Sequence, residues 1–148
     1  VVGNVVNALD RRTGETVWTA ATEPSNATYR IAMRVAVGDN YVVVFSAGSP
    51  TSMWSADVAP IVTALDFATG QVRWRVELNR IAVNVGLVEG TLMIDQDQVL
   101  VATMATLTAL SLVDGRVQWS EALQGASGEG PRPIALAVPG RSQQADRN

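Results

Sequence analysis

The sequence predicts an all-β protein built from β-propeller blades, which are four-stranded antiparallel sheets, and it predicts that the propeller is incomplete. Three observations lead to this prediction. One short pattern occurs in three copies, the copies recur at a spacing typical of propeller blades, and the strands between them are apolar on both faces.

The repeated pattern has the form A-L-[DS]-x-x-[TD]-G-x-x-x-W and occupies residues 8–18, 64–74 and 109–119. It predicts a hairpin in which a strand ends at the Asp or Ser, a tight turn places Gly at positive φ, and a second strand carries the Trp. The Asp is expected to accept backbone N–H bonds, a role that Ser111 and Asp114 share in the third copy. The small Ala admits a neighbouring layer, and the Trp fills the space between layers.

The spacing of the copies predicts a blade of about 45 residues. An apolar strand at residues 41–46 precedes the second copy and another at 98–103 precedes the third, and both are expected to be covered on each face by adjacent blades. The first two copies lie further apart because residues 47–60 form an insertion. The strands that precede these two are predicted at residues 33–37 and 92–95.

The predicted organisation is a partial β-propeller over residues 1–121, the start of a further blade over 122–140 and a polar, disordered tail over 141–148. The partial propeller comprises the last two strands of one blade and two full blades, while residues 81–88 form either an extra strand or a connection. Because a propeller needs about four blades and the sequence does not open on Met, we expect a piece of a longer protein. The rest of that propeller, or another copy, would close the ring.

The composition excludes several classes of function. Eleven Arg and no Lys stand against fourteen acidic residues, and the resulting net charge of −3 argues against binding to nucleic acid. The absence of Cys and His removes disulfides, thiolate nucleophiles and the commonest general base and metal ligand. No apolar run reaches the roughly 18 residues of a membrane helix, so no transmembrane segment is expected.

The pattern resembles the Trp-containing repeat of the quinoprotein-like β-propellers, also called the pyrroloquinoline-quinone (PQQ) type. That repeat has the form A-x-D-x-x-T-G-x-x-x-W, at the turn between the third and fourth strands of a blade. Residues 8–18 and 64–74 match it at every specified position, whereas the third copy departs at Ser111 and Asp114. The resemblance covers about residues 1–121 and implies the fold, but a structural motif does not by itself imply an activity.

Two branches of that family imply different functions. One branch holds dehydrogenases that bind PQQ with a calcium ion, use an Asp as base and typically carry a vicinal disulfide. The other branch has lost the cofactor and includes a periplasmic lipoprotein that helps insert outer-membrane β-barrels, as well as the sensor ectodomains of some bacterial Ser/Thr kinases. No Cys-Cys pair occurs in this sequence, which favours the cofactor-free branch.

The resemblance therefore implies a non-catalytic interaction or scaffold module that acts in the periplasm or at the cell surface, with a protein partner and no cofactor in this segment. One alternative is a fragment of a PQQ-dependent alcohol or sugar dehydrogenase, which would bind PQQ and calcium. A second alternative is the sensor region of a bacterial Ser/Thr kinase.

Met53 and Trp54 are the candidate contacts for a partner or ligand, because they lie in the insertion and Trp54 is the Trp outside the repeat. The alternative is that both pack over their own blade. The run Asp95-Gln96-Asp97-Gln98 offers oxygen atoms of the kind calcium binds, but a calcium loop needs more ligands and a plain turn is preferred. No catalytic or metal-binding residue is assigned, since no two carboxylates outside the turns have a meaningful spacing.

Overall fold

A computed structural model describes residues 4–22, 30–48, 57–79, 81–82, 90–103, 106–123, 135–139 and 141–144 of the protein. The strands are β1 (Val5–Leu9), β2 (Thr16–Ala21), β3 (Arg30–Val37), β4 (Tyr41–Gly48), β5 (Asp57–Val58), β6 (Ile61–Asp66), β7 (Val72–Glu77), β8 (Ile81–Ala82), β9 (Gly90–Asp95), β10 (Gln98–Thr103), β11 (Thr106–Ser111), β12 (Val117–Ala122), β13 (Ala135–Val138) and β14 (Arg141–Gln144). Within these ranges the protein is all-β.

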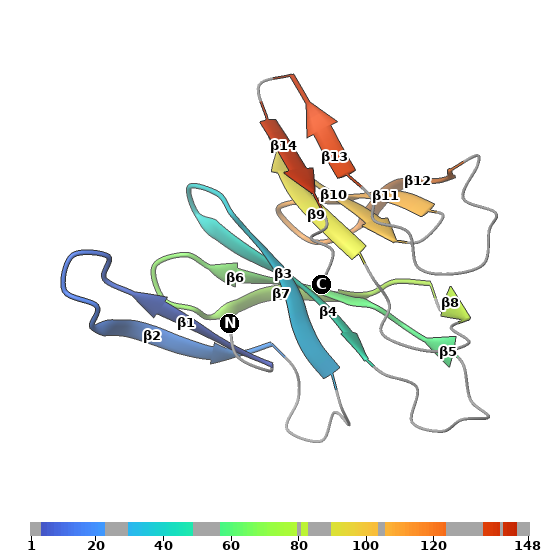
Figure 1. The fold of residues 1–148 in the computed structure, drawn as a ribbon. Coiled ribbons are helices and arrows are strands. Elements are labelled where there is room, and N and C mark those ends of the chain that lie inside the picture. Colours follow the sequence, from blue (N-terminus) through green and yellow to red (C-terminus); the bar gives the residue numbers. More distant parts are fainter. Residues whose placement is uncertain are drawn as a thin grey trace.

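Two four-stranded antiparallel sheets form the centre of the molecule (Figure 1). The first full blade has the strand order β3-β4-β6-β7, and the second full blade has the order β9-β10-β11-β12. The hairpin β1-β2 is the N-terminal half blade, and the hairpin β13-β14 is the C-terminal half blade. The described sheets do not close into a ring, so the chain is a partial propeller, as the repeat predicts.

The three copies of the pattern form hairpins with one shared register. Ala8 pairs with Trp18, Ala64 with Trp74 and Ala109 with Trp119, and a β-bulge follows each Ala. The N-terminal half blade therefore corresponds to the third and fourth strands of a full blade. In the C-terminal half blade Val138 pairs with Arg141, which leaves two residues between the strands as between Asp95 and Gln98, and β13 contacts β9; β13 and β14 therefore correspond to the first and second strands.

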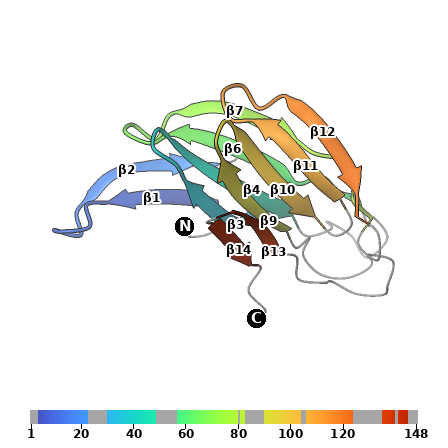
Figure 2. The same ribbon diagram turned by 90° about the horizontal axis from the view of Figure 1, so that it is seen from above.

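The blades follow one another around an axis, with equivalent strands adjacent. In Figure 2, β2, β7 and β12 lie along one side of the molecule, and β3, β9 and β13 lie along the other. The innermost strands meet, because β9 contacts both β3 and β13. This order, with first strands inside and fourth strands outside, is the arrangement of a propeller.

The largest hydrophobic core lies between the two full blades. Val43, Phe45 and Val62 from the first full blade pack with Leu92 and Val99 from the second, and all five are buried. A Cβ added at Gly90 would lie 2.6 Å from the Phe45 ring, so the absence of a side chain there lets the blades approach closely. Strands covered on both faces are apolar at successive positions, which explains the run of Val residues in β4.

Smaller cores attach the two half blades. Val6 of β1, with Trp18 and Ala20 against it, packs on Val42, Val44 and Leu65 of the first full blade. On the other side, Leu136 of β13 packs on Met93 and Ala102 of the second full blade. Each blade thus shares apolar surface with the blades next to it.

The structure differs from the sequence prediction at residues 141–148. The composition predicts a disordered tail, yet residues 141–144 form β14, which pairs with β13 in regular antiparallel register. Backbone N–H and C=O groups make these bonds whatever the side chains are, so a polar composition does not prevent strand pairing. Residues 145–148 lie outside the described part of the chain.

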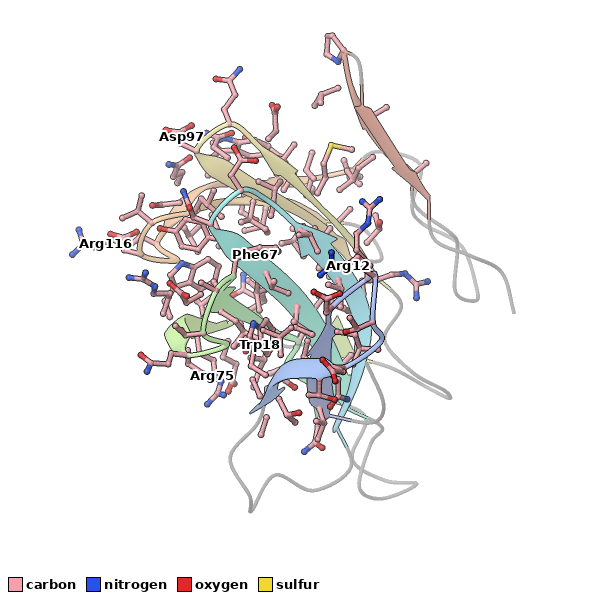
Figure 3. All side chains as sticks on the ribbon, turned by 90° about the vertical axis from the view of Figure 1, so that its left-hand side faces the viewer. Arg12, Trp18, Phe67, Arg75, Asp97 and Arg116 are labelled. Carbon is pink, nitrogen blue, oxygen red and sulfur yellow. The ribbon has the colours of Figure 1, made fainter. Side chains whose placement is uncertain are left out.

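The two ends of the blades differ in how they are connected. At one end, the tight-turn end, short turns join the strands, and the turns within a blade bond to each other through Phe67 N to Asn40 O (3.1 Å) and Leu112 N to Asp97 O (2.8 Å). Figure 3 views this end, where Arg12, Phe67, Asp97 and Arg116 mark successive turns. The opposite end carries the longer connections, including β8, the described part of residues 81–88, paired with β5.

Candidate functional site: the joint between blades

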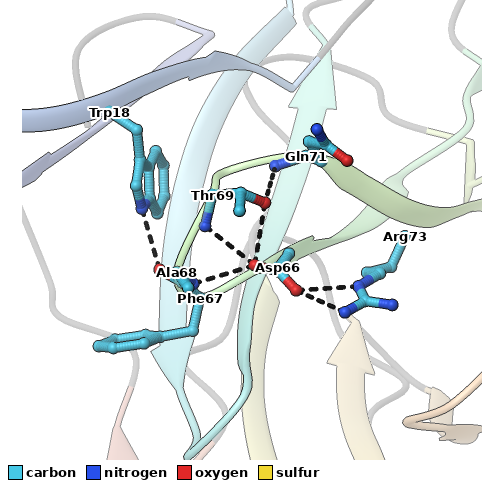
Figure 4. Close-up of polar contacts among 7 residues, drawn as sticks. All are labelled: Trp18, Asp66, Phe67, Ala68, Thr69, Gln71 and Arg73. Atoms are coloured by element: carbon cyan, nitrogen blue, oxygen red, sulfur yellow. Dashed lines mark hydrogen bonds and ion pairs between the residues drawn. The ribbon is translucent and has the colours of Figure 1, made fainter.

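The Asp of the repeat holds its turn together, as the pattern predicts. Oδ1 of Asp66 accepts hydrogen bonds from the backbone N–H groups of Ala68 (3.0 Å) and Thr69 (2.9 Å) and from the Thr69 hydroxyl (2.9 Å) (Figure 4). Its other oxygen, Oδ2, accepts from two nitrogens of Arg73. The Arg73 hydrogen bonds, followed by those from Thr69, lower the pKa of Asp66 from 3.8 to about 2.

The other two copies close their turns in related ways. Oδ1 of Asp10 accepts from the backbone N–H groups of Arg12 (2.8 Å) and Thr13 (2.9 Å), and the Thr13 bond is the largest cause that lowers the pKa of Asp10. In the third copy a hydrogen bond from the Ser111 hydroxyl is the largest cause that lowers the pKa of Asp114. Oδ1 of Asp114 accepts a hydrogen bond from the backbone N–H of Arg116 at 3.2 Å, so the part of the prediction that concerns Asp114 is confirmed, while the predicted backbone bond to Ser111 stays a prediction.

The glycine of each turn adopts the predicted backbone conformation. The φ angles are 76° at Gly14, 71° at Gly70 and 74° at Gly115, in the left-handed region that favours glycine. In each turn the glycine N–H donates to the backbone carbonyl of the residue four positions earlier, at 2.7–2.9 Å. The turn thus presents a flat backbone surface without a side chain.

Trp18 of the N-terminal half blade docks on that surface of the next blade. Its indole Nε1 donates a hydrogen bond to the carbonyl oxygen of Phe67 at 2.9 Å (Figure 4). The indole ring covers Gly70, where an added Cβ would lie 2.5 Å from ring atom Cε3. Glycine is needed here both for its φ and for the space that the ring occupies.

Trp74 repeats the arrangement one blade further on. Its Nε1 donates to the carbonyl oxygen of Leu112 at 2.8 Å, and an added Cβ at Gly115 would lie 2.6 Å from its Cε3. The Trp74 side chain is only 8% exposed. We call this unit, a Trp, the next blade's turn glycine and the carbonyl after its Asp or Ser, the inter-blade joint.

The sequence predicts that the Trp residues lie between blades, and Trp18 and Trp74 confirm it. It did not predict that the turn glycine is the surface on which the ring docks, nor that a carbonyl oxygen accepts the indole N–H. The fixed spacing of Asp, Gly and Trp in every copy is the signal that could have indicated this. The third Trp, Trp119, is 39% exposed and has no such partner within the described residues.

A hollow of about 610 Å³ lies at the tight-turn end between the two full blades. The turn of β3-β4 lines one side through Asp39 and Asn40, and Ile94, Gln96 and Leu112 line the other. Gln96 sits in a two-residue turn at φ 53°, so Asp95-Gln96-Asp97-Gln98 forms the plain turn that the sequence analysis preferred. Among the described residues, no three His, Cys, Asp or Glu side chains cluster in a way that could hold a metal ion.

Met53 and Trp54, the predicted contact residues, lie outside the described residues. The chain that contains them connects β4 to β5, and β5 pairs with β8 at the end opposite the tight turns. The prediction for these two residues is therefore untested. In the described ranges, no helix has the length and apolar character needed to span a membrane.

Comparison with known proteins agrees with the repeat. A family model described as "Outer membrane protein assembly factor BamB" matches residues 2–143. The chain belongs to this family. Its PQQ-type repeat and propeller fold are thereby confirmed.

The solved structures that resemble the chain include BamB from Moraxella catarrhalis. The two chains share 18% sequence identity with a TM-score of 0.36, and the match covers 64% of this chain and 38% of the other. The chain thus spans well under half the length of that BamB. No curated protein sequence matches the chain.

Proposed function

We propose that this protein is a non-catalytic interaction module that acts outside the cytoplasm and binds a protein partner. The observation that carries the proposal is the family match over residues 2–143, since the family description names a factor that assembles outer-membrane proteins. Because fold alone does not specify function, the proposal also requires a binding surface made of residues that do not hold the repeat together.

The contacts of the repeat support this proposal. Both carboxylate oxygens of Asp66 bond within their own hairpin, and the indole N–H groups of Trp18 and Trp74 bond to the next blade. The residues that define the motif therefore hold the scaffold together. Partner binding therefore falls to segments outside the motif, and we assign it to the insertion that carries Met53 and Trp54, between β4 and β5.

A cross-linking experiment tests the surface. The protein is expressed with a photoreactive amino acid in place of Trp54, with a leader that exports it, and cross-linked proteins are identified by mass spectrometry. The same amino acid in place of Val113, which is 70% exposed on the tight-turn end, is the control. We expect one protein cross-linked from position 54 and not from 113.

The partner found in this way is then purified and its affinity measured. Trp54→Ala should weaken binding by about 30-fold, as expected for a Trp at the centre of an interface, while Val113→Ala leaves it unchanged. Equal affinity of the two variants would reject the insertion as the contact surface. Stoichiometric uptake of PQQ with calcium, with quinone-dependent dye reduction, would reject the non-catalytic function in favour of a dehydrogenase.

A further inference from the structure

The hollow of about 610 Å³ at the tight-turn end lies between two complete blades. All of its lining residues belong to the first or the second full blade, so its walls do not involve the half blades. Its volume falls within the range of about 300–1,000 Å³ that is typical of small-molecule sites. The polar side chains that line the hollow decide which ligand it can hold.

Three polar side chains in this hollow have no bonding partner, although the backbone around them is bonded. The carbonyl oxygen of Asn40 accepts a hydrogen bond from Phe67 N at 3.1 Å, which fixes the turn. Asp39, Asn40 and Gln96 line the hollow, and their side chains make no hydrogen bond or ion pair within the described residues. In contrast, both carboxylate oxygens of Asp66 bond within their own hairpin. The hollow thus offers one carboxylate and two amides that are free to bind a ligand.

Gln96 occupies a position where the turn geometry favours glycine. Its φ of 53° lies in the left-handed region, and glycine is the usual residue at such an angle in a two-residue hairpin turn. A residue with a side chain is strained there, and residues strained in this way cluster at ligand sites. A purely structural turn gains nothing from Gln96, whereas a binding site gains a free amide.

The charge of the lining restricts the class of ligand. Asp39 is the one charged residue among those that line the hollow, and its carboxylate repels anions. A carboxylate only accepts hydrogen bonds, whereas the amides of Asn40 and Gln96 both donate and accept. Neighbouring hydroxyl groups match this set, because each hydroxyl donates to one group and accepts from another.

Apolar groups make up much of the remaining lining. Ile94 and Leu112 of the second full blade provide hydrocarbon surface, and Tyr41 of the first full blade adds an aromatic ring. A few polar groups among apolar side chains are typical of small-molecule sites. A sugar ring carries hydroxyl groups at its edge and C–H groups on its faces, so it can contact both kinds of lining at once.

We propose that this hollow is a binding site for an uncharged sugar, either a single ring or one unit of a longer glycan. The Asp39 carboxylate accepts hydrogen bonds from sugar hydroxyls, and the ring packs on Tyr41. The amides of Asn40 and Gln96 bond to the adjacent hydroxyls. This site is independent of the protein partner proposed for the insertion between β4 and β5.

Isothermal titration calorimetry of the protein tests the proposal with four uncharged sugars. The probes are glucose, N-acetylglucosamine and their β-linked dimers, cellobiose and chitobiose, and lysine amide is the cationic comparator. We expect at least one of the four sugars to bind with a Kd of about 1 mM or lower. Tighter binding of a dimer than of its monomer would identify the ligand as a glycan. Binding of none of the four, or tighter binding of lysine amide, would overturn the proposal.

Gln96→Gly separates binding from folding. Glycine adopts a φ of 53° without strain, so this variant should be at least as stable as the unchanged protein in urea denaturation. It should nevertheless bind the sugar about 10-fold more weakly, because the amide is lost. Unchanged affinity in this well-folded variant would overturn the proposal.

Asp39→Ala and Asp97→Ala are a matched pair that tests the role of charge. Asp97, labelled at the tight-turn end in Figure 3, is next to Gln96 in the chain but does not line the hollow. Asp39→Ala should weaken sugar binding by about 10-fold or more, whereas Asp97→Ala should leave it unchanged. The affinity of the unchanged protein should also be equal at low and high salt, because the ligand is uncharged. Equal weakening by the two variants, or binding that salt abolishes, would reject an uncharged sugar as the ligand.

Discussion

At the scale of single residues, the Asp, Gly and Trp of the motif each make more than one stabilising contribution. The carboxylate of Asp66 closes its turn through one oxygen and holds Arg73 through the other. Gly70 provides a left-handed φ and a surface bare enough for Trp18. Trp74 fills the space between sheets and also satisfies the carbonyl of Leu112, which the ring would otherwise screen from water.

The two tasks of Trp74 can be separated by substitution. Trp74→Phe keeps an aromatic ring on Gly115 but leaves the Leu112 carbonyl without its donor, so we expect a loss of about 1–3 kcal/mol in the free energy of unfolding. Trp74→Ala also leaves a cavity and should cost about 3–5 kcal/mol. Urea denaturation followed by circular dichroism measures both. A Trp74→Phe protein as stable as the unchanged chain would show that the N–H bond contributes nothing.

Asp66 makes stability depend on pH at low values. Its pKa falls from 3.8 to about 2 on folding, so the ionised carboxylate stabilises the folded state above pH 3.8, and that contribution is lost as pH falls toward 2. Asp66→Asn removes this contribution. The unchanged chain should therefore be more stable than the variant at neutral pH, with a difference that narrows between about pH 4 and pH 2.

Denaturant titrations of both proteins across that pH range measure the difference. Glu121→Gln, which removes an exposed carboxylate from β12, controls for the loss of one negative charge. A difference that stayed constant down to pH 2 would mean that Asp66 acts through its shape rather than its charge.

At the scale of elements, the hairpin of the repeat is the unit, and its neighbours decide whether it is complete. All three hairpins have the same register, the same bulge and a turn glycine at the same backbone angle. Only two of the three turn glycines have an indole on them. Local sequence therefore determines the hairpin, and the next blade determines the environment of its turn.

This comparison provides a matched pair of substitutions. Gly14→Ala and Gly70→Ala impose the same left-handed strain, about 1–2 kcal/mol, because their φ angles are 76° and 71°. Gly70→Ala must also displace the Trp18 ring, which should cost about 1–3 kcal/mol more, as overpacking does. Thermal unfolding measures both losses of stability. Equal losses of stability in the two variants would show that the Trp18 ring does not need a bare glycine at position 70.

A second pair tests the close approach of the full blades. Gly90→Ala would place a methyl group 2.6 Å from the Phe45 ring, while Gly38→Ala would place one 3.4 Å from the terminal methyl group of Ile94. We expect Gly90→Ala to lower the free energy of unfolding by about 1–3 kcal/mol and Gly38→Ala to have a much smaller effect. Urea denaturation measures both changes in the free energy of unfolding. A Gly90→Ala protein as stable as the unchanged chain would mean that the two full blades can separate without cost.

At the scale of the whole molecule, the chain is a row of blades in which each contacts only its neighbours. Such proteins gain stability from each unit and from each interface. The core between the two full blades is the largest, and the half blades are attached by smaller clusters. In the described structure neither strand of a half blade is paired on both sides, so the backbone bonds of the half blades should open first.

Amide hydrogen exchange should therefore rank the strands. Protection should be greatest in β4, β6, β10 and β11, which have paired strands on both sides, and least in β13 and β14. Trp74→Ala should lower protection in both full blades together because it weakens their shared core. Protection in β13-β14 equal to that in β4 would show that the C-terminal half blade is as firmly held as a full one.

The blade period, the hairpins, the positive φ of the turn glycines and the closing of the first two turns by Asp10 and Asp66 could be predicted from the amino-acid sequence, because these features depend on residues a few positions apart. It also placed Trp18 and Trp74 between sheets. It did not predict β14, since strand pairing there depends on β13 rather than on apolar side chains. Nor could it show which turn glycine each Trp covers.

Those pairings depend on how the blades pack, because they join residues far apart in the chain, such as Trp18 with Phe67 and Trp74 with Leu112. The packing of the blades also decided which copies of the motif are complete. Leu9, Gly14 and Trp119 follow the same pattern as their equivalents, but no neighbouring blade covers them within the described residues, because burial depends on the neighbouring blade and not on the local sequence.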